Sequence, residues 1–343
     1  MFQSRTHTCN ELRLGNVGEK VKLVGWMENV REVGSNFAFV VLRDFYGTTQ
    51  VVVETEDMMK IVKSVNKEST ISVEGVVRER ASKNPKQDTG DVEVVPEKIE
   101  ILGKCRYNEL PFEINRSREA DESARLKYRY LDLRNPAVKK NIILRCNVIS
   151  ALRQAMTAHG FLEITTPILT ASSPEGARDY LVPARKHPGK FYALPQAPQQ
   201  FKQLLMVGGV PKYYQIAACF RDEDPRADRL YGEFYQLDME MSFVDSGETV
   251  RQEIEPLIVD LSKNFGGKKL VNTYKSKDTD FSQHLDQIPR IPYTESMEKY
   301  GTDKPDLRYD MPLVELTKAL ENTGFGVFAK AECVKAICVK GGA

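Results

Sequence analysis

The stretch CFRDEDPRADRLYGEFYQLDMEMSF, residues 219–243, predicts two strands joined by a charged loop. From Phe234 onward, apolar and polar residues alternate, as in a strand with one buried face. The apolar side comprises Leu237, Met239, Met241 and Phe243, and the polar side comprises Gln236, Asp238 and Glu240. Such a strand lies half-buried in an antiparallel sheet, so its polar face is free to line a site.

The charged loop places Arg221 and Glu223 just before this polar face. A planar guanidinium group suits phosphate oxygens, whereas carboxylates such as Asp238 suit an ammonium group. These residues alone are also compatible with a solvated strand and a charged hairpin. The neighbouring motifs favour a ligand site.

The order Phe-Arg-x-Glu, long loop and acidic strand resembles motif 2 of class II aminoacyl-tRNA synthetases. Upstream, the strings SPEGARDYLVPAR (173–185) and YALPQAPQQFKQLLM (192–206) closely resemble the amino-acid-binding loop and helix of the aspartyl branch of that family. The resemblance covers most of residues 125–243. It implies an antiparallel catalytic sheet with flanking helices in an α+β multidomain protein.

The resemblance also implies an L-aspartate site. Glu175, on a mobile loop, and Gln199 correspond to residues that hold the substrate amino group, and so does Asp238. Lys202 corresponds to the lysine that neutralises the substrate side-chain carboxylate. Gln199 and Lys202 project from one face of the helix opened by Pro198, because they are three residues apart.

For ATP, the resemblance implies Arg221 and Glu223 as the catalytic pair, with Arg221 at the α-phosphate and Glu223 near adenine. Asp222 and Gln236 complete the predicted ATP site. Mg²⁺ is the expected counter-ion of the phosphates, and no protein nucleophile is required. Two departures from relatives stand out: Ala197 replaces a common serine, and the loop after Arg226 is one residue longer.

Residues 1–103 predict a small barrel of the OB type. Strands are expected at 21–27, 37–43, 49–54, 70–80 and 92–102, with a short helix near 57–65. OB barrels bind single-stranded nucleic acid through aromatic and basic side chains. Residues 24–53 resemble the anticodon-binding barrel of the family.

That second resemblance implies that Phe39 stacks on a base and that Gln50 reads one. Arg31, Arg78 and Arg80 are expected at the RNA backbone. By periodicity alone, Phe39 is equally compatible with a place in the barrel core.

A helix is expected from Asn135, as N-cap, to Gly160, with Pro136 at its first position. Its predicted apolar stripe comprises Val138, Ile142, Ile149, Leu152 and Met156. The following strand, FLEITTPIL, is expected to stop at Pro167. Helix, strand and proline resemble motif 1, which implies a homodimer with Pro167 at its interface.

Residues after Phe243 show no glycine-rich motif 3. Residues from Tyr300 onward resemble the start of an α/β domain that bacterial aspartyl enzymes insert between motifs 2 and 3. The expected domains are the barrel (1–103), a hinge (104–134), a catalytic domain with motifs 1 and 2 (135–285) and the start of the insertion (286–343). The chain is therefore expected to be the N-terminal portion of a longer synthetase.

A formal net charge of +1 with 28% charged residues means that any nucleic-acid surface is a local patch. The six cysteines are scattered without zinc-ligand spacing, so no metal site is assigned, and reduced thiols favour the cytoplasm. No signal peptide or membrane-spanning run is expected.

The predicted function is an aspartate–tRNA ligase that uses ATP to charge tRNA(Asp). This chain alone is expected to be inactive, because motif 3 is absent. Whether tRNA(Asn) is also charged stays open, because that choice depends on small differences in the barrel. The alternative is a non-catalytic paralogue that binds tRNA or a protein. An asparaginyl or lysyl enzyme is disfavoured, since the string PEGARDYLVP is typical of the bacterial aspartyl type.

Overall fold

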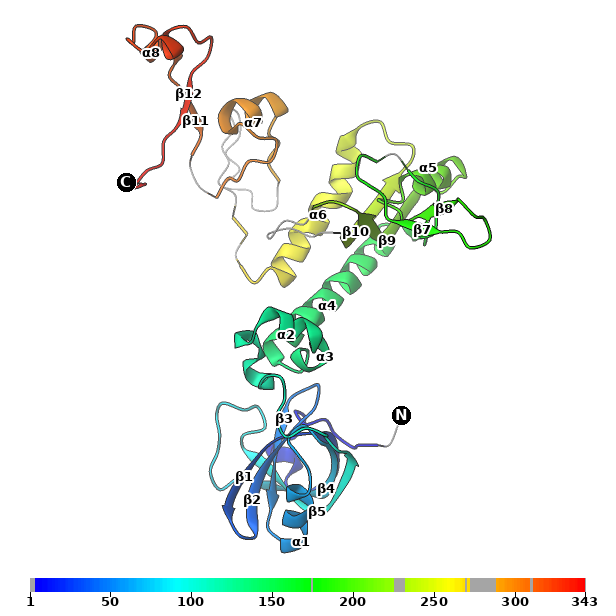
Figure 1. Ribbon diagram of the computed structural model, residues 1–343, viewed down its shortest axis with the longest axis vertical. Coiled ribbons are helices and arrows are strands. Elements are labelled where there is room, and N and C mark those ends of the chain that lie inside the picture. The colour runs from blue at the N-terminus through cyan, green and yellow to red at the C-terminus, as the bar shows by residue number, and fades with distance from the viewer. Residues whose placement is uncertain are drawn as a thin grey trace. The chain divides into compact units, whose positions relative to one another are not determined.

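The computed structural model describes residues 4–173, 175–224, 232–268, 270–271, 288–308 and 311–342. The chain divides into two compact units, Met1–Ile142 and Ile143–Ala343. Figure 1 shows the first unit in blue to green and the second in green to red. Each unit is described by itself.

The first unit contains a closed barrel of five strands, which confirms the predicted OB class (Figure 1). Around the barrel the order is β1 (Lys20–Gly34), β2 (Phe37–Arg43), β3 (Thr48–Val53), β5 (Val92–Gly103) and β4 (Thr70–Glu79). Neighbours run antiparallel except β3 and β5, which are parallel. Helix α1 (Glu56–Lys63) follows β3, and a 3₁₀ turn, η1 (Leu14–Asn16), precedes β1.

Strand β1 is longer than the predicted 21–27 because a register shift between Met27 and Asn29 lets it continue along β2. Strand β2 alternates between a buried and an outward side. Ala38, Val40 and Leu42 lie in the barrel core, whereas Phe39 lies on the outward side and is only partly buried. The structure therefore excludes the core alternative for Phe39.

The segment after the barrel, residues 104–134, which we call the hinge, folds around a small core of Phe112, Ile114 and Leu131. It consists of η2 (Ile114–Glu119), α2 (Glu122–Lys127) and α3 (Arg129–Asp132). Asp132 is completely buried beneath these turns. It accepts hydrogen bonds from Ser117 Oγ at 2.6 Å and Arg125 Nη2 at 3.3 Å, and it pairs with Arg129.

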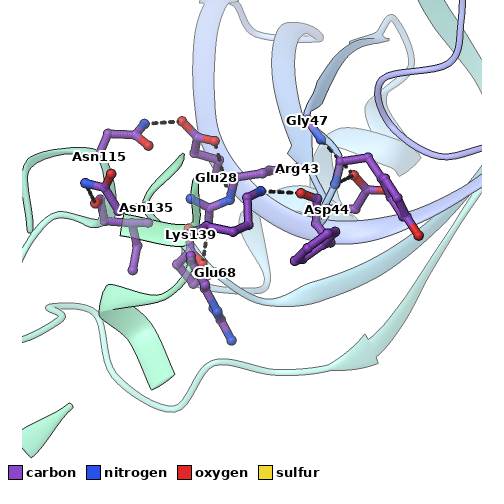
Figure 2. A network of polar contacts seen from close by, with 12 residues as sticks. Glu28, Arg43, Asp44, Gly47, Glu68, Asn115, Asn135 and Lys139 are labelled. Carbon is purple, nitrogen blue, oxygen red and sulfur yellow. Dashed lines mark hydrogen bonds and ion pairs between the residues drawn. The ribbon is translucent and has the colours of Figure 1, made fainter. Parts of the chain in front are cut away.

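A network of charged groups joins the barrel to the hinge within the first unit (Figure 2). Arg43 Nη2 and Arg134 Nη1 each donate to Glu68 Oε2 at 2.6 Å. The Arg134 guanidinium lies 4.1 Å from the ring centroid of Trp26. Lys139 Nζ donates to the carbonyl of Phe45. Strand, loop and hinge thus share one partly buried set of charges.

Helix α4 (Pro136–Ala158) begins and ends where the sequence predicts. Asn135 Oδ1 accepts from the Ala137 amide at 2.9 Å, and Gly160 ends the turn with a φ of +79°. Of the predicted stripe, Val138 and Met156 are buried, but Ile142 is exposed. Its two neighbours, Ile143 and Leu144, are exposed as well.

The second unit is built on a three-stranded sheet in the order β10–β9–β6. Strands β9 (Lys212–Arg221) and β10 (Gly232–Met241) are antiparallel, as predicted, whereas β6 (Leu162–Glu163) runs parallel to β9. Strand β6 ends well before Pro167. Figure 1 shows α4 and α6 (Gly247–Phe265) beside this sheet.

The apolar side of β10 packs onto these helices. Leu237, Met239 and Met241 contact the cluster that includes Met156 and Leu257. The prediction that Phe243 continues this side is wrong, since its side chain is 98% exposed and its φ is +56°. Strand β9 begins opposite Met241, so residues beyond Met241 have no strand to pair with.

The remaining elements are short. They are β7 (Leu181–Pro183), β8 (Phe191–Ala193), α5 (Gln199–Val207), α7 (Tyr293–Tyr300), β11 (Leu313–Glu315), α8 (Thr317–Leu320), α9 (Gly326–Ala329) and β12 (Lys335–Ile337). Strands β7 and β8 form a hairpin, and β11 pairs antiparallel with β12. Among the described residues, no helix combines the length and the apolar character needed to cross a bilayer.

We expect Asp132→Asn to lower the free energy of unfolding of the first unit by about 2 to 4 kcal/mol at neutral pH, because it removes the buried carboxylate that pairs with Arg125 and Arg129. Burial raises the pKa of Asp132, but hydrogen bonds from Ser117 and Arg125 outweigh it, so the net pKa is lowered. Asp132 therefore stabilises the fold above the ordinary carboxyl pKa, and this contribution is lost as the pH falls through the lowered value.

Urea unfolding at neutral and acidic pH measures this effect. Asp121→Asn is the matched control, because the same chemical change occurs at an exposed carboxylate. Equal unfolding free energies for Asp132→Asn and the wild type at neutral pH would contradict the prediction.

Candidate functional site

The polar face of β9 and β10 is set by their pairing register. Gln215 lies opposite Asp238, and Ala217 lies opposite Gln236. Because paired residues share a face, the amide, carboxylate and small side chains gather on one side of the sheet. Ala217, in the middle of this face, is only 1% exposed.

Helix α5 places a cation against this face. Lys202 is only 9% exposed, and its Nζ donates to Asp238 Oδ1 at 2.9 Å. The same Nζ lies 3.4 Å from Glu240 Oε2. Asp238 is 6% exposed, and its other oxygen, Oδ2, has no hydrogen-bond partner among the described residues. A buried carboxylate oxygen without a donor is unfavourable unless a ligand supplies one.

Cys219 lies on β9, on the same side as Gln215 and Ala217. Burial raises the pKa of Cys219 to about 11. Arg221 and Lys202 lower this pKa, whereas Asp238 and Glu175 raise it. Strand alternation puts Cys219 and Arg221 on the side of β9 that bears Gln215, and Lys202 contacts Asp238 on the same face of the sheet.

The structure shows fewer contacts for the other predicted site residues. Gln199 lies in the first turn of α5, one turn before Lys202. Gln236 Nε2 donates weakly to Asp238 Oδ1 at 3.4 Å. Glu175 Oε1 accepts from Ser173 Oγ at 3.2 Å and has no direct bond to Lys202. Glu223 is exposed at the end of β9.

Arg221 lies over an aromatic ring, with its guanidinium 4.9 Å from the ring centroid of Phe234. The Asp222 amide donates to the Arg178 carbonyl at 3.0 Å, and Arg178 Nε donates to the Asp222 carbonyl at 3.0 Å. The Asp222 carboxylate, a predicted ATP contact, lies 3.9 Å from Arg178 Nε. The loop assignments at residues 225–231 lie outside the described residues.

Gln196 is a site residue that the sequence did not single out. It is 1% exposed, and its Oε1 accepts from the Ala177 amide at 3.1 Å. Its Nε2 donates to the Ala177 carbonyl at 2.9 Å and to Asp179 Oδ1 at 2.6 Å. One buried amide thus holds the segment that follows Glu175.

Other contributors are Gln215, Phe234 and Glu240. Gln215 Oε1 accepts from Tyr213 Oη and Thr166 Oγ1, each at 3.0 Å. The alternation of β10 predicts that Glu240 lies on the polar side of the strand. Glu240 therefore meets Lys202 once α5 packs against that side. The string QAPQ is the sequence feature that points to Gln196.

The outward surface of the barrel contains a second set of predicted residues. Arg31 lies opposite Phe39 on neighbouring strands, with its guanidinium 4.9 Å from the ring centroid. Gln50 lies opposite Val41, two residues beyond Phe39 and on the same side of the barrel wall. The phenylalanine and the glutamine therefore lie on the same outward surface of the barrel.

Glu93, also absent from the predicted set, organises the other three residues. Arg80 Nη2 donates to Gln50 Oε1 at 2.6 Å, and Gln50 Nε2 donates to Glu93 Oε2 at 2.8 Å. Arg78 Nη2 donates to Glu93 Oε1 at 2.8 Å. The orientation of the Gln50 amide is thereby fixed.

Both parts of the chain match known protein families. Residues 121–329 match the family described as tRNA synthetases class II (D, K and N). The chain belongs to this class II tRNA synthetase family. Residues 21–102 match the OB-fold nucleic acid binding domain, in agreement with the barrel.

Among relatives of this class II chain, an aspartate–tRNA ligase of Streptomyces avermitilis is 51% identical over 332 residues, covering 96% of the chain and 54% of the relative. An aspartate–tRNA(Asp/Asn) ligase of Rickettsia prowazekii is also 51% identical, covering 96% and 52%. The chain spans about half the length of the curated relatives it matches.

A solved relative has the same fold. The asparaginyl-tRNA synthetase of Pyrococcus horikoshii, complexed with asparaginyl-adenylate, superposes with a TM-score of 0.65 at 26% identity. The match covers 75% of this class II chain and 57% of the other.

We expect Gln196→Leu to speed hydrogen exchange at the Ala177 amide by roughly tenfold, because it removes a buried acceptor worth about 1 to 1.5 kcal/mol. Hydrogen exchange followed by NMR or mass spectrometry measures the effect. Gln203→Leu makes the same change at an exposed position of α5 and serves as control. Unchanged exchange at Ala177 would show that Gln196 does not hold this segment.

Proposed function

We propose that this chain provides the amino-acid-activating site and the anticodon-binding barrel of an ATP-dependent aspartate–tRNA ligase. The observation that carries the proposal is the buried pair of Lys202 and Asp238, 2.9 Å apart on the polar face of the sheet. The pair offers one cation and one anion to a ligand that has both a carboxylate and an amine. The names of the two 51% identical relatives support the same activity.

L-aspartate suits these charges. Its side-chain carboxylate would pair with Lys202, and its ammonium group would donate to the free Oδ2 of Asp238, with Gln199 and Glu175 beside it. Asparagine lacks the second carboxylate and would leave buried charge poorly compensated. The proposed specificity therefore arises from charge rather than from size.

ATP would bind at the far end of the same strands. Arg221, held against Phe234, would contact the α-phosphate, with Glu223, Asp222 and Gln236 nearby. The described residues contain no group of three or more potential metal ligands. Magnesium is commonly bound by one or two carboxylates together with substrate phosphates, so it fits as the ion that ATP brings and that neutralises phosphate charge.

The proposed chemistry needs alignment rather than a protein nucleophile. A carboxylate oxygen of aspartate attacks the α-phosphorus of ATP, and pyrophosphate leaves, giving aspartyl-adenylate. A ribose hydroxyl at the 3′ end of tRNA then attacks the carbonyl carbon of this mixed anhydride, and AMP leaves. Arg221 would stabilise the charge that builds up on the phosphate oxygens.

The barrel is the proposed reader of the tRNA anticodon. Phe39 would stack on a base, Gln50 would read a base edge, and Arg31, Arg78 and Arg80 would meet the backbone. We propose tRNA(Asp) as the acceptor. One relative is named for both tRNA(Asp) and tRNA(Asn), so tRNA(Asn) is a second candidate acceptor.

We also propose a cytoplasmic homodimer. Pro167 is exposed and is followed by the exposed apolar residues Ile168 and Leu169, which suits a place in a subunit interface. All six cysteines are free thiols, as expected of a reducing compartment. The proposed domain division is the barrel (1–103), hinge (104–134), catalytic domain (135–285) and insertion (286–343).

In a chain that also contains motif 3, Arg221→Ala is expected to lower aspartate-dependent ATP–pyrophosphate exchange by about 100-fold or more, because one transition-state donor is lost. Lys202→Gln is expected to weaken L-aspartate binding, measured by calorimetry, by roughly 30-fold or more. Arg251→Ala, at an exposed arginine of α6, is the control. Full exchange in Arg221→Ala would refute its role, and a wild type that binds neither aspartate nor ATP would refute the proposed activity.

Phe39→Ala is expected to weaken binding of a tRNA(Asp) transcript by roughly tenfold, since base–aromatic stacking contributes about 1 to 3 kcal/mol per base. Fluorescence anisotropy measures the dissociation constant. Phe325→Ala, at an exposed phenylalanine of the second unit, is the control. Equal affinities of Phe39→Ala and the wild type would remove the stacking role.

A further inference from the structure

The chain contains a long stretch without acidic residues. From Tyr180 to Arg221 there is no Asp or Glu, although 48 of the 343 residues are acidic. The cations in this stretch are Arg185, Lys186, Lys190, Lys202, Lys212 and Arg221. Such a gap makes the local charge strongly positive in a chain whose formal net charge is only +1.

Three of these six cations belong to the candidate site or are paired with a carboxylate. Lys202 and Arg221 belong to the candidate site, and Lys212 donates to Glu253 at 2.7 Å. The other three, Arg185, Lys186 and Lys190, are exposed on the turn between β7 and β8. No carboxylate of the described residues lies within ion-pair distance of any of these three.

The turn that carries the three cations, residues 184–190, is internally hydrogen-bonded. The Ala184 amide donates to the Lys190 carbonyl at 3.0 Å, and the Lys190 amide donates to the His187 carbonyl at 3.0 Å. Gly189 adopts a φ of +78°, which favours glycine. The turn thus presents three positive charges with no nearby carboxylate at one tip, and such a group of charges attracts anionic ligands.

Exposed aromatic rings lie beside this tip. Phe191 and Tyr192, on β8, follow Lys190 directly, and Tyr180 immediately precedes β7. Aromatic rings combined with basic side chains are the usual surface for single-stranded nucleic acid, because bases stack on the rings and phosphates meet the cations. A purely electrostatic contact would not require the rings.

The base of the hairpin is joined to the candidate site. The Leu194 amide donates to the Tyr180 carbonyl, and the Phe220 amide donates to the Pro195 carbonyl, each at 2.9 Å. The second bond links the chain after β8 directly to β9. Figure 1 shows the hairpin beside α5 and β9.

We propose that the β7–β8 hairpin is an RNA-contact surface for the single-stranded 3′ end of the acceptor tRNA. Arg185, Lys186 and Lys190 bind its phosphates, and the neighbouring rings receive its bases. The inference rests on the proposed function, since that activity requires an RNA 3′ end to reach Lys202 and Asp238. It adds an RNA surface separate from the barrel.

The test uses two RNA probes: an acceptor-stem minihelix of tRNA(Asp) with its single-stranded 3′ end, and the anticodon stem-loop. Binding is measured by fluorescence anisotropy over a range of salt concentrations. For the variant Arg185→Gln/Lys186→Gln/Lys190→Gln, we expect the dependence of log K on log salt for the minihelix to become less steep by about two to three. Binding of the anticodon stem-loop should stay unchanged.

Lys263→Gln/Lys318→Gln/Lys330→Gln removes the same charge from exposed positions elsewhere in the second unit and is the matched control. Its minihelix binding should equal that of the wild type. An equal loss in both triple variants would mean bulk charge only and would overturn the proposal. Thermal melting checks that each variant is folded.

The outcomes separate this inference from the proposed function. If the wild type binds both RNAs and the hairpin variant binds the minihelix equally well, the hairpin surface is refuted while tRNA binding stands. If the wild type binds neither RNA, both proposals fail. If the hairpin variant instead shifts the chain to a smaller species in sedimentation, with minihelix binding intact, the hairpin is a contact between copies of this chain.

Discussion

The register between β9 and β10 is the constraint on which the candidate site depends. It puts Gln215 opposite Asp238 and so decides that the carboxylates face α5 rather than α4 and α6. A slip of one residue would turn Asp238 toward the apolar cluster and Leu237 toward Lys202. Burial of Leu237, Met239 and Met241 against the helices therefore fixes the position of the polar groups.

Much of this arrangement is predictable from the sequence. The alternation in β10, the Asn135 cap of α4 and the barrel strands all follow from local patterns that tertiary packing does not override. Phe243 is a miss, because the end of a strand is set by where its partner begins, which local alternation does not show. Gln196 is another miss, since a glutamine becomes a buried anchor only when the backbone of a distant segment closes around it.

The barrel and hinge depend on a different kind of interaction, which is buried charge. Glu68 accepts from Arg43 and Arg134, yet Nε and Nη1 of Arg43 have no hydrogen-bond partner among the described residues. Desolvated charges of this kind contribute little net stability but are strongly destabilising when one partner is lost. The network thus fixes one geometry of this junction more than it strengthens the fold.

The contact between Arg31 and Phe39 has a consequence for the proposed binding of a base to the barrel. In the free protein the guanidinium shields one face of an aromatic ring that would otherwise be an adhesive apolar spot. In the proposed complex, a base that stacks on that face would displace the guanidinium, which would then be available to a phosphate. This single rearrangement would form two contacts, and the ring would be covered both before and after binding.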